Sequence, residues 1–279
     1  MKTGKAVKWM FLVAILNLNA QNNFSAEFTI NTQPTESISI NETCFGIDYA
    51  KTFNSKFRME NELQVNFKNV SYPTNDLSNS VTNYSEVRNK FGFSYFKSDK
   101  IRLNFELEPY IASENNWKVS DIDFLGALNV DFFLSSNKKL TVGASRNNFL
   151  GKTMVLPTFS YYYEYNKEVN FSIGFPESKW SYSNNIRNVF SLKSTFNGSI
   201  YNLENTSNSL ALKSTKSSFS QLTTALEYER NMDSNWYVNF KVGYDFNRKY
   251  LLLDNNYNTT LDFDIKDGCQ FGLTIKYKH

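Results

Sequence analysis

Apolar and polar residues alternate one by one over long stretches of this chain, and this alternation constrains its fold more than any other feature. In the segment 101–108 every odd-numbered residue is apolar and every even-numbered residue is polar or charged. The segment 236–246 shows the same period, with its apolar residues at even positions. Because successive side chains of a β-strand point to opposite faces, the period predicts strands with one apolar and one polar face. No comparable stretch has helical spacing, so the sequence predicts an all-β fold.

The number of alternating segments predicts the number of strands. We expect twelve, at 38–53, 57–72, 84–97, 101–112, 121–134, 139–146, 155–165, 168–175, 187–203, 209–230, 235–253 and 259–277. Two weaker segments, 24–32 and 178–184, would raise the count to fourteen, which we keep as the alternative. Short turns and longer polar loops roughly alternate along the chain. This is typical of an antiparallel up-and-down barrel with an even number of strands.

The length of the alternating runs favours a barrel that crosses a membrane. Many runs reach about 9–11 residues, the length of a tilted membrane-spanning strand, whereas strands of soluble proteins average about 5–6. Aromatic residues collect near predicted strand ends, at 161–165, 236–237 and Tyr277, as in the aromatic girdles of membrane barrels. We therefore predict a transmembrane β-barrel in the outer membrane of a Gram-negative bacterium. A secreted soluble all-β protein is the alternative.

Residues 1–20 have the pattern of a secretory signal peptide. Lys2, Lys5 and Lys8 precede the short apolar run 9–16, and a small residue stands before Gln21. The apolar run is too short to span a bilayer. We expect cleavage after residue 20 and a single barrel domain at 21–279. Without the three leader lysines the chain has 27 basic and 27 acidic residues, and a neutral barrel has no overall field that would attract nucleic acid.

The polar face of the strands is expected to line a charged, water-filled lumen. The residues predicted to line it are Arg58, Glu60, Glu62, Glu86, Arg88, Lys90, Arg102, Glu106, Glu108, Lys241 and Asp245. Charges withdrawn from bulk water need partners, so we expect ion pairs among them. A barrel of twelve to fourteen strands lies between those filled by side chains and those that hold an open channel. The expected function is a small, porin-like channel or transport barrel. The alternative is a structural or partner-binding barrel of an envelope complex.

The end of the chain is expected to guide barrel assembly. In hydrocarbon every backbone amide has to be paired, so the last strand has to pair with the first. The residues predicted to form the assembly signal are Phe271, Leu273, Ile275 and Tyr277. The expected partners are outer-membrane lipid, the barrel-assembly machinery during biogenesis and an envelope protein.

Catalytic chemistry has few candidate residues. The single histidine is His279, which excludes a Ser-His-Asp triad and a histidine-rich zinc site. Glu60 and Glu62, like Glu106 and Glu108, lie two residues apart on one strand face and could form an acid–base pair. Ion pairing with the neighbouring basic residues is the simpler interpretation. We predict no enzymatic activity, no cofactor and no metal.

The chain has two cysteines, Cys44 and Cys269, which excludes a disulfide scaffold. The two residues fall on opposite-phase faces of their predicted strands. We therefore expect free thiols.

Three segments resemble a known family. The segments 156–161 (LPTFSY), 174–182 (GFPESKWSY) and 198–203 (GSIYNL) are similar to an uncharacterised outer-membrane barrel family of Bacteroidota, a domain of unknown function. The Asn-Ala-Gln junction at the expected cleavage site and the abundance of Asn and Tyr resemble that phylum too. The resemblance covers about residues 40–279. It implies a fold and a location and carries no activity.

Overall fold

The structure is a computed structural model that describes residues 22–35, 38–71, 81–114, 116–204, 214–263 and 265–279. The expected signal peptide at 1–20 lies outside these residues. Within the described residues, no helix is long and apolar enough to cross a bilayer. The fold is all-β, with one 3₁₀ turn, η2 (Val119–Asp121), among the described elements.

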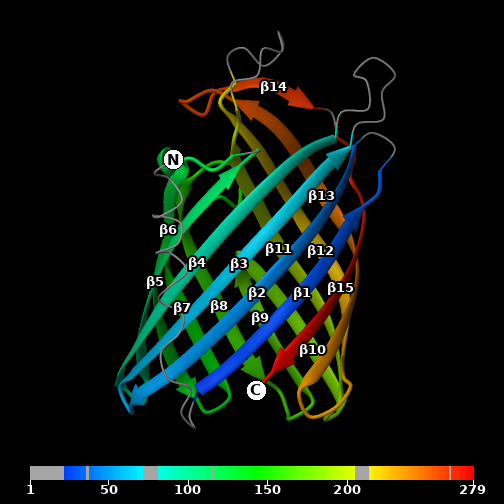
Figure 1. The fold of residues 1–279 in the computed structure, drawn as a ribbon. Helices are drawn as coiled ribbons and strands as arrows, with labels where there is room; N and C mark the ends of the chain where they lie inside the picture. Colours follow the sequence, from blue (N-terminus) through cyan, green and yellow to red (C-terminus); the bar gives the residue numbers. More distant parts are fainter. Residues whose placement is uncertain (1–21, 36–37, 72–80, 115, 205–213, 264) are drawn as a thin grey trace.

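Consecutive strands pair antiparallel in a closed ring (Figure 1). The strands are β1 (Asn22–Gln33), β2 (Ser39–Asn54), β3 (Phe57–Ser71), β4 (Val81–Ser98), β5 (Ile101–Ser113), β6 (Ile122–Ser135), β7 (Lys138–Asn147), β8 (Met154–Glu164), β9 (Val169–Phe175), β10 (Glu177–Asn185), β11 (Asn188–Asn202), β12 (Lys216–Asn231), β13 (Trp236–Leu253), β14 (Thr259–Phe263) and β15 (Gly268–Lys278). β15 pairs with both β1 and β13, and β12 pairs with β13, which closes the barrel. β14 pairs only with the end of β13, so the ring itself has fourteen strands.

The predicted count of twelve strands is therefore wrong, and the alternative of fourteen is confirmed. Both weaker segments are strands of the ring, β1 and β10. β10 was hard to detect because it has only nine residues, follows Pro176 directly and carries mostly small polar residues on its inward face. The predicted strand 259–277 is two elements: β14, which pairs only with β13 and lies outside the ring, and β15, which belongs to the ring. The described part of the predicted strand 209–230 begins at Lys216.

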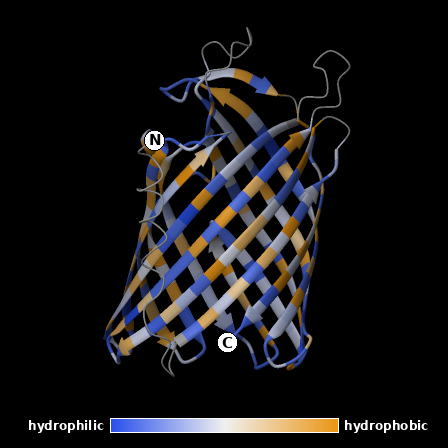
Figure 2. Cartoon of the chain, viewed as in Figure 1, coloured by the Kyte–Doolittle hydropathy of each residue, from blue (hydrophilic) through white to orange (hydrophobic). Residues whose placement is uncertain are grey.

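Hydrophilic and hydrophobic residues alternate along the strands (Figure 2), and many of the large apolar side chains are exposed on the outside of the barrel, where they form an apolar band. On β13 the outward residues run from Trp236 to Phe246, and ten steps of about 3.3 Å at a tilt of about 40° span roughly 25 Å. Phe240 is 52% exposed, and the β15 residues Leu273 and Ile275 are 39% and 41% exposed. These large apolar side chains would be unfavourable against water, and their height matches the hydrocarbon layer of a membrane.

Aromatic rings gather on the outside near the short turns. Trp236 and Tyr277 have ring centroids 5.3 Å apart, and Phe57 and Tyr95 have centroids 5.1 Å apart. These residues lie at the ends of β13, β15, β3 and β4 that meet the short connections. This end of the barrel is called the lower end below, and the end with the longer loops is called the upper end.

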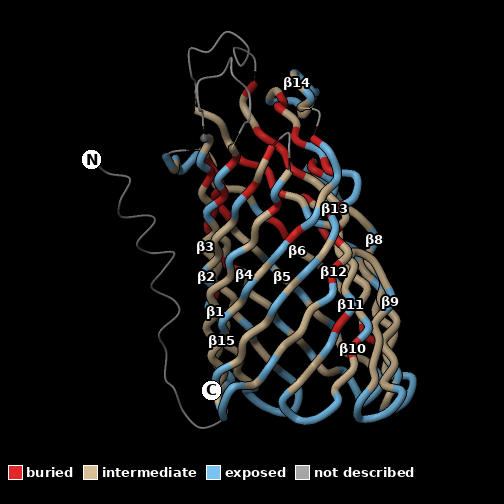
Figure 3. Tube along the Cα trace, turned by 90° about the vertical axis from the view of Figure 1, so that its right-hand side faces the viewer, coloured by how far each residue is buried: buried red, intermediate tan, exposed pale blue. Residues whose placement is uncertain are grey.

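The wall is not equally high all round. β9 and β10 have seven and nine residues, against fifteen in β11, so the β9–β10 hairpin stops partway up the wall. Buried residues gather towards the upper end, where β14 lies (Figure 3). Buried side chains therefore fill the barrel at its upper end, and its wall is lower at the β9–β10 hairpin than elsewhere.

Candidate functional site

The inward face of the barrel can be identified from contacts across the lumen. Lys68 on β3 donates from Nζ to Ser199 Oγ on β11 at 2.9 Å, although β3 and β11 are not neighbours in the sheet. Lys68 therefore points inward, and so do residues two, four or more even steps away on β3. Directly paired residues of antiparallel strands point to the same side. By this phase, the structure places all eleven predicted lumen residues on the inward face.

Charged residues of the β3–β5 wall form two groups of ion pairs. Arg88 is bound to Glu86 at 2.5 Å and to Glu108 at 3.2 Å. Lys90 pairs with Glu62 on the neighbouring strand. Lys90 and Glu62 are directly paired in the strand register, Glu86 lies two residues from Arg88 on β4, and Glu108 lies two residues from Tyr110, the residue paired with Arg88. Side chains in these positions share the inward face and lie side by side. The charges neutralise one another within the wall.

Two other predicted lumen residues, Arg58 and Arg102, form ion pairs that differ in burial. Arg58 pairs with Glu60 at 2.8 Å, and both side chains are well exposed. Arg102 binds Asp131 of β6 through Nη2 at 2.5 Å, and Asp131 is only 2% exposed. The Asp131 carboxylate also accepts a hydrogen bond from Thr141 Oγ1 at 2.6 Å. The Arg102 pair is thus buried in a polar network, whereas the Arg58 pair faces the water of the lumen.

The sequence prediction missed Asp131 as a lumen residue. Its position between the outward residues Val130 and Phe132 would have placed it on the inward face.

Glu106, Lys241 and Asp245 form no ion pair with any described residue. Asp245 is fully buried and accepts a hydrogen bond from Thr223 Oγ1 at 2.6 Å. Lys241 lies between two cavities and lines both. Its cross-strand neighbour is Glu227. The ammonium group of Lys241 therefore stands in the lumen without a bound carboxylate in the described part of the chain.

Three polar cavities lie inside the barrel. The upper one has a volume of about 300 Å³ and is lined by Glu42, Lys68 and Arg88 on one side and by Phe149 and Phe196 on the other. A lower cavity of about 460 Å³ is lined mainly by charged and polar residues of β2–β5. A third, of about 260 Å³, lies against β1, β11–β13 and β15. Charged and polar side chains of the described residues thus line most of the wall of these cavities.

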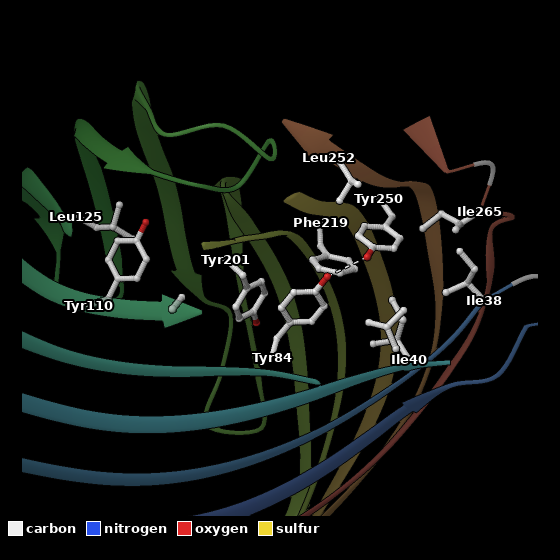
Figure 4. Close-up of a cluster of buried hydrophobic side chains, with 12 residues drawn as sticks. Ile38, Ile40, Tyr84, Tyr110, Leu125, Tyr201, Phe219, Tyr250, Leu252 and Ile265 are labelled. Atoms are coloured by element: carbon white, nitrogen blue, oxygen red, sulfur yellow. Dashed lines mark hydrogen bonds between the residues drawn. The ribbon is translucent and has the colours of Figure 1, made fainter. Parts of the chain in front are cut away.

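An apolar layer closes the upper end of this lumen (Figure 4). It consists of Ile38, Ile40, Val70, Tyr84, Tyr110, Ala112, Leu125, Tyr201, Phe219, Tyr250, Leu252 and Ile265. The hydroxyls of Tyr84 and Tyr250 share a hydrogen bond of 2.9 Å, although their strands β4 and β13 are not neighbours. The Phe219 ring stacks on Tyr250 with centroids 4.4 Å apart. Side chains from opposite walls therefore meet in the middle of the barrel.

The sequence analysis did not predict this layer. The signal was present: Ile40, Val70 and Tyr84 stand at positions whose phase is that of the charged face. Apolar residues on the polar phase, close to the strand ends with the longer loops, mark where the lumen stops being hydrated.

A direct contact between β5 and β11 completes the closure. Asn202 at the end of β11 pairs parallel with Ser113 at the end of β5, and the Glu114 N–H donates to the Asn202 carbonyl at 2.9 Å. The Glu114 carboxylate accepts a hydrogen bond from the Glu204 N–H at 3.4 Å. Burial, together with the charge of Glu204, raises the pKa of Glu114 above its ordinary value. We call this contact the β5–β11 seam.

The predicted assembly-signal residues Phe271, Leu273, Ile275 and Tyr277 lie on the outward face of β15. β15 pairs with β1, so the last strand closes onto the first. Their role in assembly stays a prediction. Cys44 faces the lumen and Cys269 faces outward, and both are free thiols. In the described part of the chain, no group of three acidic, cysteine or histidine side chains could hold a metal ion.

Comparisons with known proteins agree with this architecture. Residues 90–278 match the sequence model of a family described as "Domain of unknown function (DUF6268)". No curated protein matches the chain. The crystal structure of the Pseudomonas putida toluene transporter TodX is similar, with 11% identity and a TM-score of 0.51 over 94% of this chain and 90% of that one. At this identity the likeness shows the fold alone.

Two other solved structures have lower scores. An outer membrane channel from Pseudomonas putida F1 has 6% identity and a TM-score of 0.49, over 95% of this chain and 97% of that one. A Pseudomonas aeruginosa FadL homologue has 7% identity and a TM-score of 0.48, over 92% and 89%.

Proposed function

The chain belongs to the DUF6268 family of unknown function, and we propose that it is a transport barrel of the outer membrane that is closed at rest. The observation that carries this proposal is the division of its inward face. Charged side chains are among the residues that line the cavities inside the barrel, and apolar side chains pack together at its upper end. A barrel with a purely structural role would have no need of a hydrated lumen of this size, because side chains could fill it.

The location is part of the proposal. We propose a Gram-negative source, in the phylum Bacteroidota, with export by the signal peptide at 1–20 and insertion by the barrel-assembly machinery. The outward apolar band of roughly 25 Å supports membrane insertion, and similarity to the toluene transporter TodX supports a transport role. The neutral charge of 21–279 gives no reason to expect a nucleic-acid partner.

We propose no catalytic role. Of the carboxylates that could act as acid and base, Glu60, Glu62 and Glu108 are paired with Arg58, Lys90 and Arg88. Glu106 forms no ion pair with a described residue, so neither predicted glutamate pair has two free carboxylates. The sequence has a single histidine, His279, so a pair of histidines cannot form. Solutes would pass this lumen without covalent chemistry.

Recording single channels in planar bilayers tests the proposal. The wild-type barrel should conduct rarely, because the apolar layer is closed. Phe219→Ala should conduct steadily, because the ring that stacks on Tyr250 is removed. Phe240→Ala, which removes an outward ring of the same size, should behave like the wild type. A folded Phe219→Ala barrel that stays silent at every voltage and salt concentration contradicts a transport role.

A structural or partner-binding barrel of an envelope complex is the second candidate, favoured by the closed apolar layer itself. Co-purification in mild detergent distinguishes the two. A reproducible partner together with silent Phe219→Ala channels would favour the second candidate.

A further inference from the structure

The barrel wall has a break in its hydrogen-bond ladder above the β9–β10 hairpin. β8 pairs with β9 only from Phe159 downward, and β11 pairs with β10 only up to Thr195. Above these points, the described residues 154–158 of β8 and 197–201 of β11 have no strand partner on the side of the hairpin. The hairpin tip is attached by the last ladder pairs, Phe175 with Phe159 and Glu177 with Thr195. One further backbone hydrogen bond runs from Phe196 N–H to the Pro176 carbonyl at 3.1 Å. The wall is therefore weakest at this place.

The connection between β7 and β8, residues 148–153, fills the break. Asn148 is buried and donates from Nδ2 to Tyr110 Oη at 3.0 Å. Ser218 donates from Oγ to the Gly151 carbonyl at 2.5 Å. The Asn148 backbone packs directly on Gly198, where any Cβ would collide with it. A few side-chain contacts hold the segment in place, in contrast to the continuous ladder elsewhere in the ring.

Three aromatic rings separate the upper cavity from the outer surface at the break. Phe175 lies 5.3 Å from Phe196 and 6.5 Å from Phe149, between ring centroids. Phe149 and Phe196 also line the upper cavity. Just outside, the outward residues Ile173 and Leu192 are 59% and 44% exposed. One layer of rings thus lies between a charged cavity and the apolar surface. We call Phe149, Phe175 and Phe196 the lateral window.

The height of the window places it beside the upper leaflet of the membrane. Phe196 stands eight residues above Asn188, where β11 begins at the lower end. Eight steps of about 3.3 Å at a tilt of about 40° correspond to about 20 Å of an apolar band of about 25 Å.

We propose that the lateral window is the second exit of the lumen, through which a small amphipathic acid moves between the upper cavity and the outer leaflet. The proposal rests on the transport function proposed above. The upper end of the lumen is closed by the apolar layer, whose residues come from several strands, and by the β5–β11 seam. Opening the window breaks few backbone hydrogen bonds, and each exposed backbone group is costly in hydrocarbon.

The residues that line the upper cavity indicate which class of molecule it would accept. Phe149 and Phe196 offer an apolar surface to one end of a molecule. On the opposite side Lys68 is paired with Glu42 and Arg88 with Glu86, whereas Lys241 forms no ion pair with any described residue. An acidic end group would neutralise Lys241, and an apolar tail would lie against the rings.

Flux of octanesulfonate into proteoliposomes tests this route, because this amphipathic acid stays ionised and crosses pure lipid slowly. Phe149→Ala combined with Phe196→Ala should raise the initial rate several-fold over wild type. Phe190→Ala, which removes an outward ring lower on β11, is the matched control and should leave the rate unchanged. Folding of each variant is checked by its heat-modifiable mobility on unheated gels. Should the double variant fail to fold, Gly198→Ala, which displaces residues 148–149, should give the same increase.

The acidic end group is tested separately. Lys241→Gln should lower octanesulfonate flux several-fold and leave the much slower flux of octyltrimethylammonium unchanged. Lys193→Gln is the matched control, because Lys193 lines the third cavity and is paired with Glu177. Unchanged octanesulfonate flux in both the window variants and Lys241→Gln overturns the lateral route. If Phe219→Ala still conducts ions in that case, the transport function stands; if it is silent too, both proposals fail.

Discussion

The ammonium nitrogen of Lys68 lies 4.3 Å from the ring centroid of Phe219, directly below the apolar layer. The same nitrogen is 2.9 Å from a Glu42 carboxylate oxygen and 2.9 Å from Ser199 Oγ. Lys68 therefore contacts both a charged residue of the lumen and a ring of the apolar layer. The contact is favourable on both sides, because a cation is attracted to the face of an aromatic ring while its remaining hydrogens bond to oxygen.

Replacing Lys68 by Met should destabilise the barrel by about 1–3 kcal/mol, because Glu42 loses its partner in a partly buried site. Urea unfolding in lipid vesicles, followed by heat-modifiable mobility, measures the change. Lys51→Met removes a lysine that lies over the exposed Phe53 ring, and its effect should stay within about 0.5 kcal/mol. Equal effects of the two substitutions would show that Lys68 carries no special contact.

Replacing Arg102 by Met should cost about 3–5 kcal/mol, because the buried Asp131 carboxylate loses its closest cation. The double variant Arg102→Met with Asp131→Asn should recover part of this loss, since no buried charge remains. Arg58→Met is the control: its ion pair with Glu60 is exposed, and exposed pairs contribute about 0–1 kcal/mol. The same urea titration measures all three variants. A loss for Arg102→Met no greater than that for Arg58→Met would contradict the buried network.

The β5–β11 seam should loosen as the pH rises. Burial and the neighbouring Glu204 raise the pKa of Glu114 above its ordinary value of 4.5. The folded barrel therefore holds this proton to a higher pH than the unfolded chain does. The stabilisation is complete below about pH 4.5 and disappears as the pH rises through the raised pKa. Glu114→Gln should remove this part of the pH dependence. Thermal unfolding midpoints between about pH 4 and pH 7 measure it, and identical profiles for both proteins would rule out Glu114 as its source.

The alternation of the sequence predicts the faces of the barrel because it reports directly where each side chain points. Phe240 is outward and Arg88 is inward for the same local reason, a period of two. The strand β10 was predicted only as a weaker candidate, because nine residues with few large apolar side chains give a weak alternating signal. The ends of most strands were predicted within three residues, since turn residues separate them.

The upper closure depends on contacts that no local pattern contains. Tyr84 and Tyr250 are 166 residues apart in the chain and share a hydrogen bond inside the barrel. Asn202 meets Ser113 because β11 leans across the lumen where β10 has ended. A single sequence shows that Tyr84 has the wrong polarity for its phase, but not which strands supply its partners.

Gly198 should be among the least replaceable residues of the wall, because the Asn148 backbone occupies the space that a side chain would need. Gly198→Ala has to displace residues 148–153, at a cost of about 1–3 kcal/mol for overpacking. Lys152 is already exposed, but a displaced segment should bend into the trypsin active site more readily, and cleavage after this residue in proteoliposomes should become several-fold faster. Gly92→Ala is the matched control, because its new methyl group would lie 3.5 Å from Glu60 Cβ, an ordinary contact. Equal trypsin sensitivity of the two variants would mean that residues 148–153 are not held by their packing on Gly198, and the lateral window would then lack the closing segment on which it depends.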